Sequence, residues 1–180
     1  MSVDTKEIEK LLVKSYNEGF SNLNFSYFDL REIPFFILER PLLLNQKRKD
    51  GSDSEEYENL NLEKVRELNL SNNYLTQIDT KISCFKGLQT LDISNNKLEQ
   101  LPRQICELGN LKEVIVNNNP LINLPQKFAS FQKLEILDLS NTAIYEIPNY
   151  IQYLYNLKEL NLANCKLSVL PKRIILPSKS

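Results

Sequence analysis

A period of 23 residues dominates this sequence. In the copy that starts at Leu88, apolar residues occupy offsets 0, 3, 5, 10, 13, 17 and 20, asparagine occupies offset 8 and proline offset 14. The same frame begins again at Val65, Leu111, Leu134 and Leu157, which is too regular to be a coincidence. A unit of this length cannot bury its apolar face alone, so neighbouring copies have to stack around one shared core. The sequence therefore predicts a solenoid.

Each repeat carries signals for a short strand followed by an outer turn. The apolar residues at offsets 3 and 5 alternate with exposed positions, as in a strand with one buried face. The proline at offset 14 has a fixed φ and no N–H, which suits the start of a short helical segment. We therefore expect an α/β fold, with a curved parallel sheet on the concave face and short helical or 3₁₀ turns on the convex face. The proline column is Pro34, Pro102, Pro125, Pro148 and Pro171.

The N-terminal end departs from the frame. A degenerate repeat begins at Phe20, so we expect six repeats over residues 20–180. Residues 1–19 are predicted to form a capping helix, because Asp4 and Glu7 resemble a capping box and apolar residues follow at helical spacing. The helix would cover the open apolar end of the first repeat. The alternative is that this helix binds a partner.

An insertion interrupts the period after the first repeat, at about residues 41–61. Its central part is rich in small, charged and turn-forming residues, which cannot bury enough apolar surface to order themselves fully. We expect a mobile surface loop at about residues 46–58. Ser52 is followed by acidic residues and resembles an acidophilic kinase site, so it is a possible phosphosite; the alternative is a plain solvated insertion.

A polar column runs through the predicted core at offset 8. A buried asparagine amide has two donors and an acceptor, so it can satisfy backbone groups where the strand turns away. Threonine and cysteine do this less completely. We expect the column to have a structural role. It consists of Phe28 in the first repeat, then Asn73, Asn96, Asn119, Thr142 and Cys165.

The frame as a whole resembles a known family. Its pattern, L-x-x-L-x-L-x-x-N-x-L-x-x-L-P-x-x-I-x-x-L, resembles the intracellular leucine-rich repeat class with 23-residue units found in Ras-suppressor-like and Scribble-like proteins, over residues 20 to about 176. The resemblance implies a protein-binding scaffold. It also implies, by analogy alone, a small GTPase, a phosphatase or a kinase as partner.

Function is expected where the copies differ. Residues at offsets 2, 4 and 6 flank the inward strand residues and should face the concave surface. The columns at these offsets hold five acidic residues and no basic one, which favours a basic partner and a salt-dependent interaction. Ile115 and Ile136 interrupt the columns and resemble a small binding hot spot, although single exposed aliphatic residues are ordinary. The predicted partner-binding residues are Glu67, Asn69, Asp92, Glu113, Ile115, Ile136, Asp138, Glu159 and Asn161.

A group of tyrosines offers an alternative binding surface. They fall outside the core offsets of the fifth repeat, so several should be exposed on the outer face, where tyrosine favours protein contacts. Packing between neighbouring outer turns is the competing explanation. The group consists of Tyr145, Tyr150, Tyr153 and Tyr155.

Composition argues against other classes of function. The 22 basic and 23 acidic residues nearly cancel, so we expect neither a nucleic-acid nor a membrane partner. Histidine is absent, and no glycine-rich phosphate loop or nucleophile with an adjacent base is present. The three cysteines have no paired spacing, which disfavours a metal site or a disulfide framework. We expect no cofactor and no enzymatic activity.

The sequence therefore predicts a non-catalytic protein-interaction module or signalling scaffold, and we expect it to be a monomer. The charged N-terminus shows no signal peptide, so we expect a cytoplasmic, intracellular protein. The last repeat has Pro177 in place of an apolar residue, either because it is its own cap or because the chain is a fragment. In the second case, the alternative function is a targeting or regulatory domain of a larger signalling enzyme.

Overall fold

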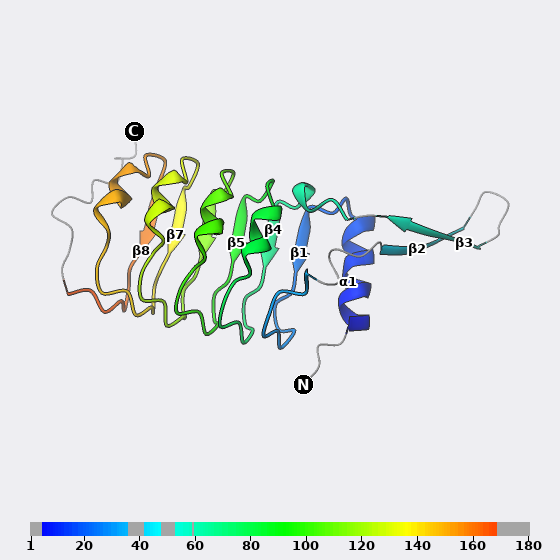
Figure 1. Cartoon of the computed structure of the whole chain (residues 1–180), viewed down its shortest axis with the longest axis horizontal. Helices are drawn as coiled ribbons and strands as arrows, with labels where there is room; N and C mark the ends of the chain where they lie inside the picture. Colours follow the sequence, from blue (N-terminus) through cyan, green and yellow to red (C-terminus); the bar gives the residue numbers. More distant parts are fainter. Residues whose placement is uncertain (1–4, 36–41, 48–52, 59, 169–180) are drawn as a thin grey trace.

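The computed structural model describes residues 5–35, 42–47, 53–58 and 60–168 as a curved stack of repeats (Figure 1). Six strands of three residues form one parallel sheet in the order β1-β4-β5-β6-β7-β8. Each strand pairs in register with the next, so that residues at equal offsets lie side by side. This arrangement confirms the predicted fold class. The strands are β1 (Asn22–Asn24), β4 (Glu67–Asn69), β5 (Thr90–Asp92), β6 (Glu113–Ile115), β7 (Ile136–Asp138) and β8 (Glu159–Asn161).

The outer segments are short 3₁₀ helices. Proline stands immediately before three of them with φ between −67° and −56°, one residue earlier than the first-turn position considered from the sequence. In the second repeat Asp79 replaces the proline, and its carboxylate accepts the backbone N–H of Lys81 at 2.8 Å. This side-chain hydrogen bond takes the place of the proline ring in fixing the start of the 3₁₀ segment. The turns span Leu62–Lys64, Thr80–Cys84, Arg103–Glu107, Gln126–Ser130 and Asn149–Tyr153.

One continuous core fills the space between the sheet and the outer turns. The apolar columns are buried along the stack, as at Leu88, Leu91 and Ile93. Helix α1 (Thr5–Asn17) lies beside β1 at the N-terminal end of the sheet and contributes the fully buried Ile8 and Leu12 to the same core.

The insertion differs from the mobile loop that the sequence suggested. Residues Leu42–Lys47 (β2) and Asp53–Glu58 (β3) pair as an antiparallel hairpin that projects beyond α1 (Figure 1). Composition indicates only how much apolar surface a segment can bury against the core. Two strands can instead satisfy their backbone groups by pairing with each other. Ser52 lies outside the described residues.

Buried asparagine amides join consecutive repeats. The amide nitrogen of Asn96 donates to the carbonyl oxygens of Leu70 and Ile93, at 3.0 and 3.1 Å, and so bridges two repeats. Its amide oxygen accepts the backbone N–H of Leu75 at 3.0 Å. Asn119 repeats this pattern one unit further along.

The ends of the asparagine column differ from its middle. Asn73 reaches back to Phe25 and accepts the backbone N–H groups of Phe28 and Leu30, so the degenerate first repeat is held without an asparagine of its own. Thr142 has a single hydroxyl, which donates to Leu139 at 2.7 Å. The column therefore makes fewer hydrogen bonds per side chain toward the C-terminal end.

A second asparagine column, which was not predicted from the sequence, lies one residue earlier. These residues have φ between 53° and 57°, in the left-handed region. Asparagine tolerates this conformation better than most non-glycine residues. Its recurrence at offset 7 was the available signal. The column is Asn72, Asn95, Asn118, Asn141 and Asn164.

Arg66 joins the first two units at the edge of the stack. One of its guanidinium nitrogens donates to the carbonyl oxygens of Glu63 and Gly87, at 2.7 and 3.0 Å. A Cβ atom at Gly87 would overlap both the Arg66 guanidinium and the Glu63 carbonyl oxygen. At Gly109 a Cβ atom would meet nothing within 4 Å.

We predict that Asn96→Ala lowers the free energy of unfolding by about 1–3 kcal/mol, because the substitution leaves buried backbone groups of two repeats without partners. Chemical denaturation measures the change. Asn123→Ala, an exposed asparagine at another offset, is the control and should stay within about 0.5 kcal/mol of the wild type. Equal effects of the two substitutions would contradict a bridging role.

We also predict that Gly87→Ala destabilises the fold by about 1–3 kcal/mol, because a backbone carbonyl has to move in addition to the arginine side chain. Gly109→Ala is the matched control and should be nearly neutral. Thermal unfolding of both variants provides the comparison. An unchanged stability of Gly87→Ala would show that Arg66 and the Glu63 carbonyl can move aside without loss of stability, and would contradict the prediction.

Candidate binding surface

Two columns of side chains line the concave face of the sheet. In β5, β6 and β7 the middle residue of the strand is buried and its two neighbours are partly exposed. The strand register places the neighbours of successive strands side by side. The offset-2 column is Asn22, Glu67, Thr90, Glu113, Ile136 and Glu159, and the offset-4 column is Asn24, Asn69, Asp92, Ile115, Asp138 and Asn161.

The offset-4 side chains also support the fold, which the sequence analysis did not anticipate. One carboxylate oxygen of Asp92 accepts the backbone N–H of Ser94 at 2.9 Å, and Asp138 accepts that of Ser140 at 2.9 Å. Asn69 and Asn161 make equivalent bonds. Aspartate and asparagine share this oxygen, and their alternation in one column was the available signal. Each aspartate keeps its second oxygen for other contacts.

Ile115 interrupts this pattern at the centre of the face. It pairs with Asp138 on the next strand, and Ile136 pairs with Glu113, so the two isoleucines lie diagonally across β6 and β7. Both are partly exposed. The structure thus brings the predicted apolar residues together with three carboxylates, those of Asp92, Glu113 and Asp138.

Asn117 follows the interruption at a position where neighbouring repeats have serine. Its amide nitrogen lies 3.4 Å from a carboxylate oxygen of Asp138. Its amide oxygen is buried and has no hydrogen-bond partner among the described residues. The polar groups of this repeat are therefore less completely hydrogen-bonded than those of its neighbours at the end of the strand.

Three of the six offset-6 residues are buried, although all six were expected to face the concave surface; Ser26 and Asn117 are partly exposed and Ala163 is exposed. Ser71, Ser94 and Ser140 are each about 5% exposed. The chain already turns at this point, since each serine N–H is held by the offset-4 side chain of its own repeat. The strand alternation ends one position earlier than the sequence interpretation assumed.

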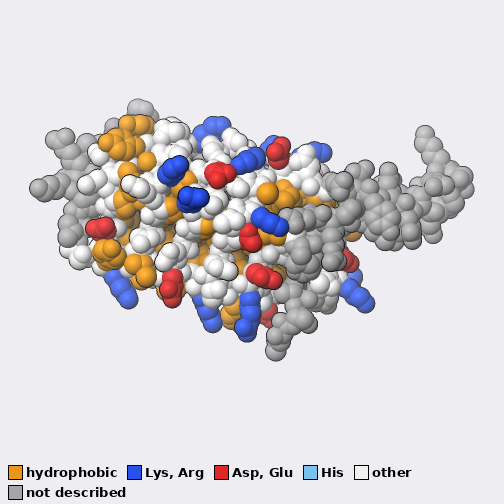
Figure 2. All heavy atoms as spheres, viewed as in Figure 1, with side chains coloured by type: hydrophobic (Ala, Val, Ile, Leu, Met, Phe, Trp, Pro, Cys, Tyr) orange, Lys and Arg blue, Asp and Glu red, His pale blue; other side chains and the backbone are white. Residues whose placement is uncertain are grey.

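Basic residues border the acidic columns. The offset-1 position, directly before the strand, holds Arg66, Lys112 and Lys158 before β4, β6 and β8, and Glu135 before β7. Lys158 forms an exposed ion pair with Glu135 at 2.5 Å, and this contact lowers the pKa of the Glu135 carboxyl. On the face seen in Figure 2, acidic and basic side chains are interspersed. Charges of both signs therefore stand near the concave columns, and the field of any one of them extends only a short distance.

The four tyrosines have different environments. Tyr153 and Tyr155 are 48% and 65% exposed, and their rings meet edge to face at 6.3 Å. Tyr150 instead donates its hydroxyl to the carbonyl oxygens at positions 124 and 125, both at 3.0 Å, and burial raises its pKa to about 12. Tyr150 therefore packs between outer turns. Tyr145 is exposed at the start of the outer segment.

Other exposed apolar residues were missed because they lie at offsets that carry no recurring pattern. Tyr74 is 48% exposed and stacks under Lys97, whose ammonium lies 5.2 Å from the ring centroid. Ile122 is 39% exposed. These residues lie beyond the C-terminal ends of the strands and outside the concave columns.

The described residues offer little for catalysis. Burial raises the pKa of the Cys106 thiol to about 11, so the thiol is protonated at neutral pH and a poor nucleophile. No group of three or more His, Cys, Asp or Glu residues in the described ranges could hold a metal ion. Likewise, no helix within those ranges is both long and apolar enough to cross a membrane.

Comparison with known proteins shows what this chain is similar to. A family model described as leucine rich repeats in two copies matches residues 63–105, and a second leucine rich repeat model matches residues 109–167. Over 43 residues the chain is 46% identical to the oligodendrocyte-myelin glycoprotein of Mus musculus, a stretch that makes up 24% of this chain and 10% of that glycoprotein.

Solved structures share the fold over most of the chain. A leucine-rich repeat protein of Leptospira interrogans is 26% identical with a TM-score of 0.61, covering 95% of this chain and 48% of that one. The plant peptide hormone receptor RGFR1, solved in complex with RGF2, is 25% identical with a TM-score of 0.61, covering 82% and 21%. YopM from Yersinia enterocolitica, at 18% identity and a TM-score of 0.64, covers 96% and 31% and shows the fold alone.

This chain thus spans about half the length of the Leptospira protein and less of the others. Proteins with such repeats generally act as protein-interaction modules. The two family matches and the stacked 23-residue units of the fold identify the chain as a leucine-rich repeat protein.

Proposed function

We propose that the concave face between β4 and β8 binds a protein partner that presents basic side chains. The observation that carries this proposal is the pair Ile115 and Ile136, surrounded by the carboxylates of Asp92, Glu113 and Asp138. Lysine and arginine have apolar stems and charged heads. Such a side chain can lay its stem on an isoleucine and place its head on a carboxylate.

The remaining concave residues extend this site. Glu67 accepts the amide of Asn22 at 2.6 Å, and Glu159 is exposed at the other end of the same column. Asn69 and Asn161 add polar groups in the offset-4 column. Because Arg66, Lys112 and Lys158 stand beside these acids, the complementary part of the partner has to reach into the concave columns and cannot act from a distance.

Both resemblance and similarity support a protein partner. The plant receptor RGFR1 was solved with RGF2, which is an example of a ligand on this fold. The resemblance to Ras-suppressor-like and Scribble-like proteins adds small GTPases, phosphatases and kinases as partner classes, and an intracellular location. Among these partners, the charge pattern favours those with a basic contact surface. In this proposal the chain is a non-catalytic scaffold or a targeting module.

The double substitution Glu113→Lys with Ile136→Ala should abolish partner capture, weakening it by about tenfold or more, because it removes an apolar contact and places a like charge opposite the partner. Affinity capture from the source cell, followed by mass spectrometry, identifies the partner and measures the loss. Raising the ionic strength should weaken the wild-type interaction in the same assay.

Glu99→Lys with Ile122→Ala is the matched control. It makes the same two changes at exposed positions outside the concave columns. The control should capture the partner as the wild type does, and circular dichroism should show both variants folded. Loss of capture in both variants, or in neither, would contradict the concave-face site.

The exposed pair Tyr153 and Tyr155 favours a second candidate surface. If the concave face is the site, Tyr153→Ala with Tyr155→Ala should leave capture within about twofold of the wild type. If this variant lost capture while Glu113→Lys with Ile136→Ala still captured the partner, the outer tyrosine surface would be the binding site instead.

A further inference from the structure

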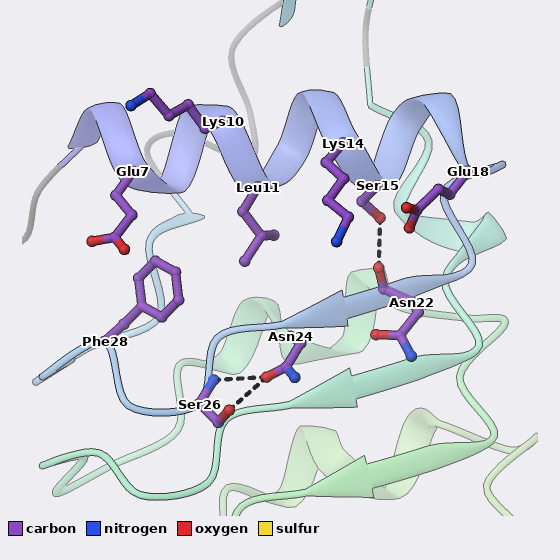
Figure 3. Close-up of a pocket in the computed structure, with 10 residues that line it drawn as sticks. All are labelled: Glu7, Lys10, Leu11, Lys14, Ser15, Glu18, Asn22, Asn24, Ser26 and Phe28. Carbon is purple, nitrogen blue, oxygen red and sulfur yellow. Dashed lines mark hydrogen bonds between the residues drawn. The ribbon is translucent and has the colours of Figure 1, made fainter.

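A groove lies between the N-terminal helix α1 and the first strand β1 (Figure 3). Its volume is about 580 Å³. Leu11 and Lys14 of α1 point into it from one side, and Asn22, Asn24 and Phe28 line the other. The groove is separate from the Ile115 and Ile136 site, which lies three to four repeats away.

The sheet pattern shows which backbone groups of β1 face this groove. In the inner strands, residues at offsets 2 and 4 bond to the preceding strand. Thus Thr90 N–H donates to Arg66 at 2.9 Å, and the Asp92 carbonyl accepts Leu70 N–H at 2.7 Å. Asn22 and Asn24 hold these offsets in β1, which has no preceding strand. Their N–H and C=O groups therefore point toward α1.

Only one of these groups is satisfied by the helix. The Ser15 hydroxyl donates to the Asn22 carbonyl oxygen at 2.5 Å. The N–H and C=O groups of Asn24 have no hydrogen-bond partner among the residues that the structure describes. Within the described part of the chain, its side chain bonds only to Ser26 of the same turn.

The size of a helix explains why the edge stays open. A helix with side chains is about 10–12 Å across, whereas a paired strand lies about 4.8 Å from its neighbour. With Ile8 and Leu12 buried in the core, α1 cannot bring its backbone to strand distance. Figure 3 shows α1 joined to β1 at Ser15 and standing apart from it toward Glu7 and Phe28.

We propose that this groove binds an extended peptide segment of a partner protein, which pairs with the open edge of β1 as an additional strand. The outward N–H and C=O groups of an edge strand are complementary to an extended backbone. The half-buried Leu11 and Phe28 supply contact for one apolar side chain. Both glutamate and lysine side chains line the groove, and Glu7, near Phe28, places a carboxylate where the peptide can present a basic residue.

The probe for this site is the capped peptide acetyl-Lys-Val-Thr-Val-Thr-Lys-amide, titrated into the whole chain labelled with ¹⁵N. We expect the Asn24 amide proton to move downfield and to exchange with solvent at least about tenfold more slowly when the peptide is bound. The same peptide with N-methyl groups on all its residue nitrogens, which blocks both edges, should bind about tenfold more weakly. Equal binding of the two peptides, or no binding of the first, would overturn the proposal.

Two substitutions at one position separate the backbone from the side chain. Asn24→Pro and Asn24→Ala both lose the bond to Ser26, but only proline removes the N–H, and an edge strand tolerates proline where that N–H faces outward. Asn24→Ala should bind the probe within about twofold of the wild type and Asn24→Pro about tenfold more weakly. Similar affinities of both variants for the probe would contradict strand pairing. If Asn24→Pro does not fold, the comparison with the N-methylated peptide tests strand pairing in its place. Glu113→Lys with Ile136→Ala should bind the probe as the wild type does. This control distinguishes a failure of the groove proposal from a failure of the concave-face proposal.

Discussion

The bridging asparagine amide is the interaction on which the rest of this structure depends. Asn96 holds carbonyl groups of two repeats and an N–H group of the earlier one, so the turn of the earlier repeat is completed by the asparagine of the following repeat. The turn places the strand, and the strand places the concave side chains. Apolar burial supplies most of the driving force, but it does not by itself specify where the chain leaves the sheet. The asparagine column does so at the same offset in successive units.

The variable columns take part in both folding and surface chemistry. Asp92 and Asp138 each use one carboxylate oxygen for the local turn, and the second oxygen of Asp138 lies near the amide nitrogen of Asn117. Both side chains are partly exposed. Ile115 has no side-chain oxygen and so cannot make that turn bond. Two residues later, Asn117 replaces the serine of the neighbouring repeats, and its buried amide oxygen has no hydrogen-bond partner among the described residues. A repeat that departs from its own pattern at the centre of an open face is a reasonable place for recognition.

The sequence predicted the fold well because its information is periodic. Repetition of Leu88 and its counterparts identified the core, the strand register and the outer turns, since stacked units place equal offsets side by side. Prediction from the sequence failed where a feature depends on a contact that does not recur from repeat to repeat. The hairpin in the insertion depends on pairing between its own strands, and the Tyr150 hydroxyl bond depends on an outer turn of the preceding repeat. The open edge of β1 follows from the position of α1, which periodicity does not give.

Native-state hydrogen exchange tests the central claim, that the asparagine column couples the repeats into one cooperative unit. The amide hydrogens of Leu75 and Leu98 are held by the asparagine of the following repeat. Our account predicts that both exchange only through global unfolding, with the same free energy as the buried strand amide of Leu91. Exchange of Leu75 or Leu98 at a clearly lower free energy than Leu91 would show that the turns open independently, and would contradict it.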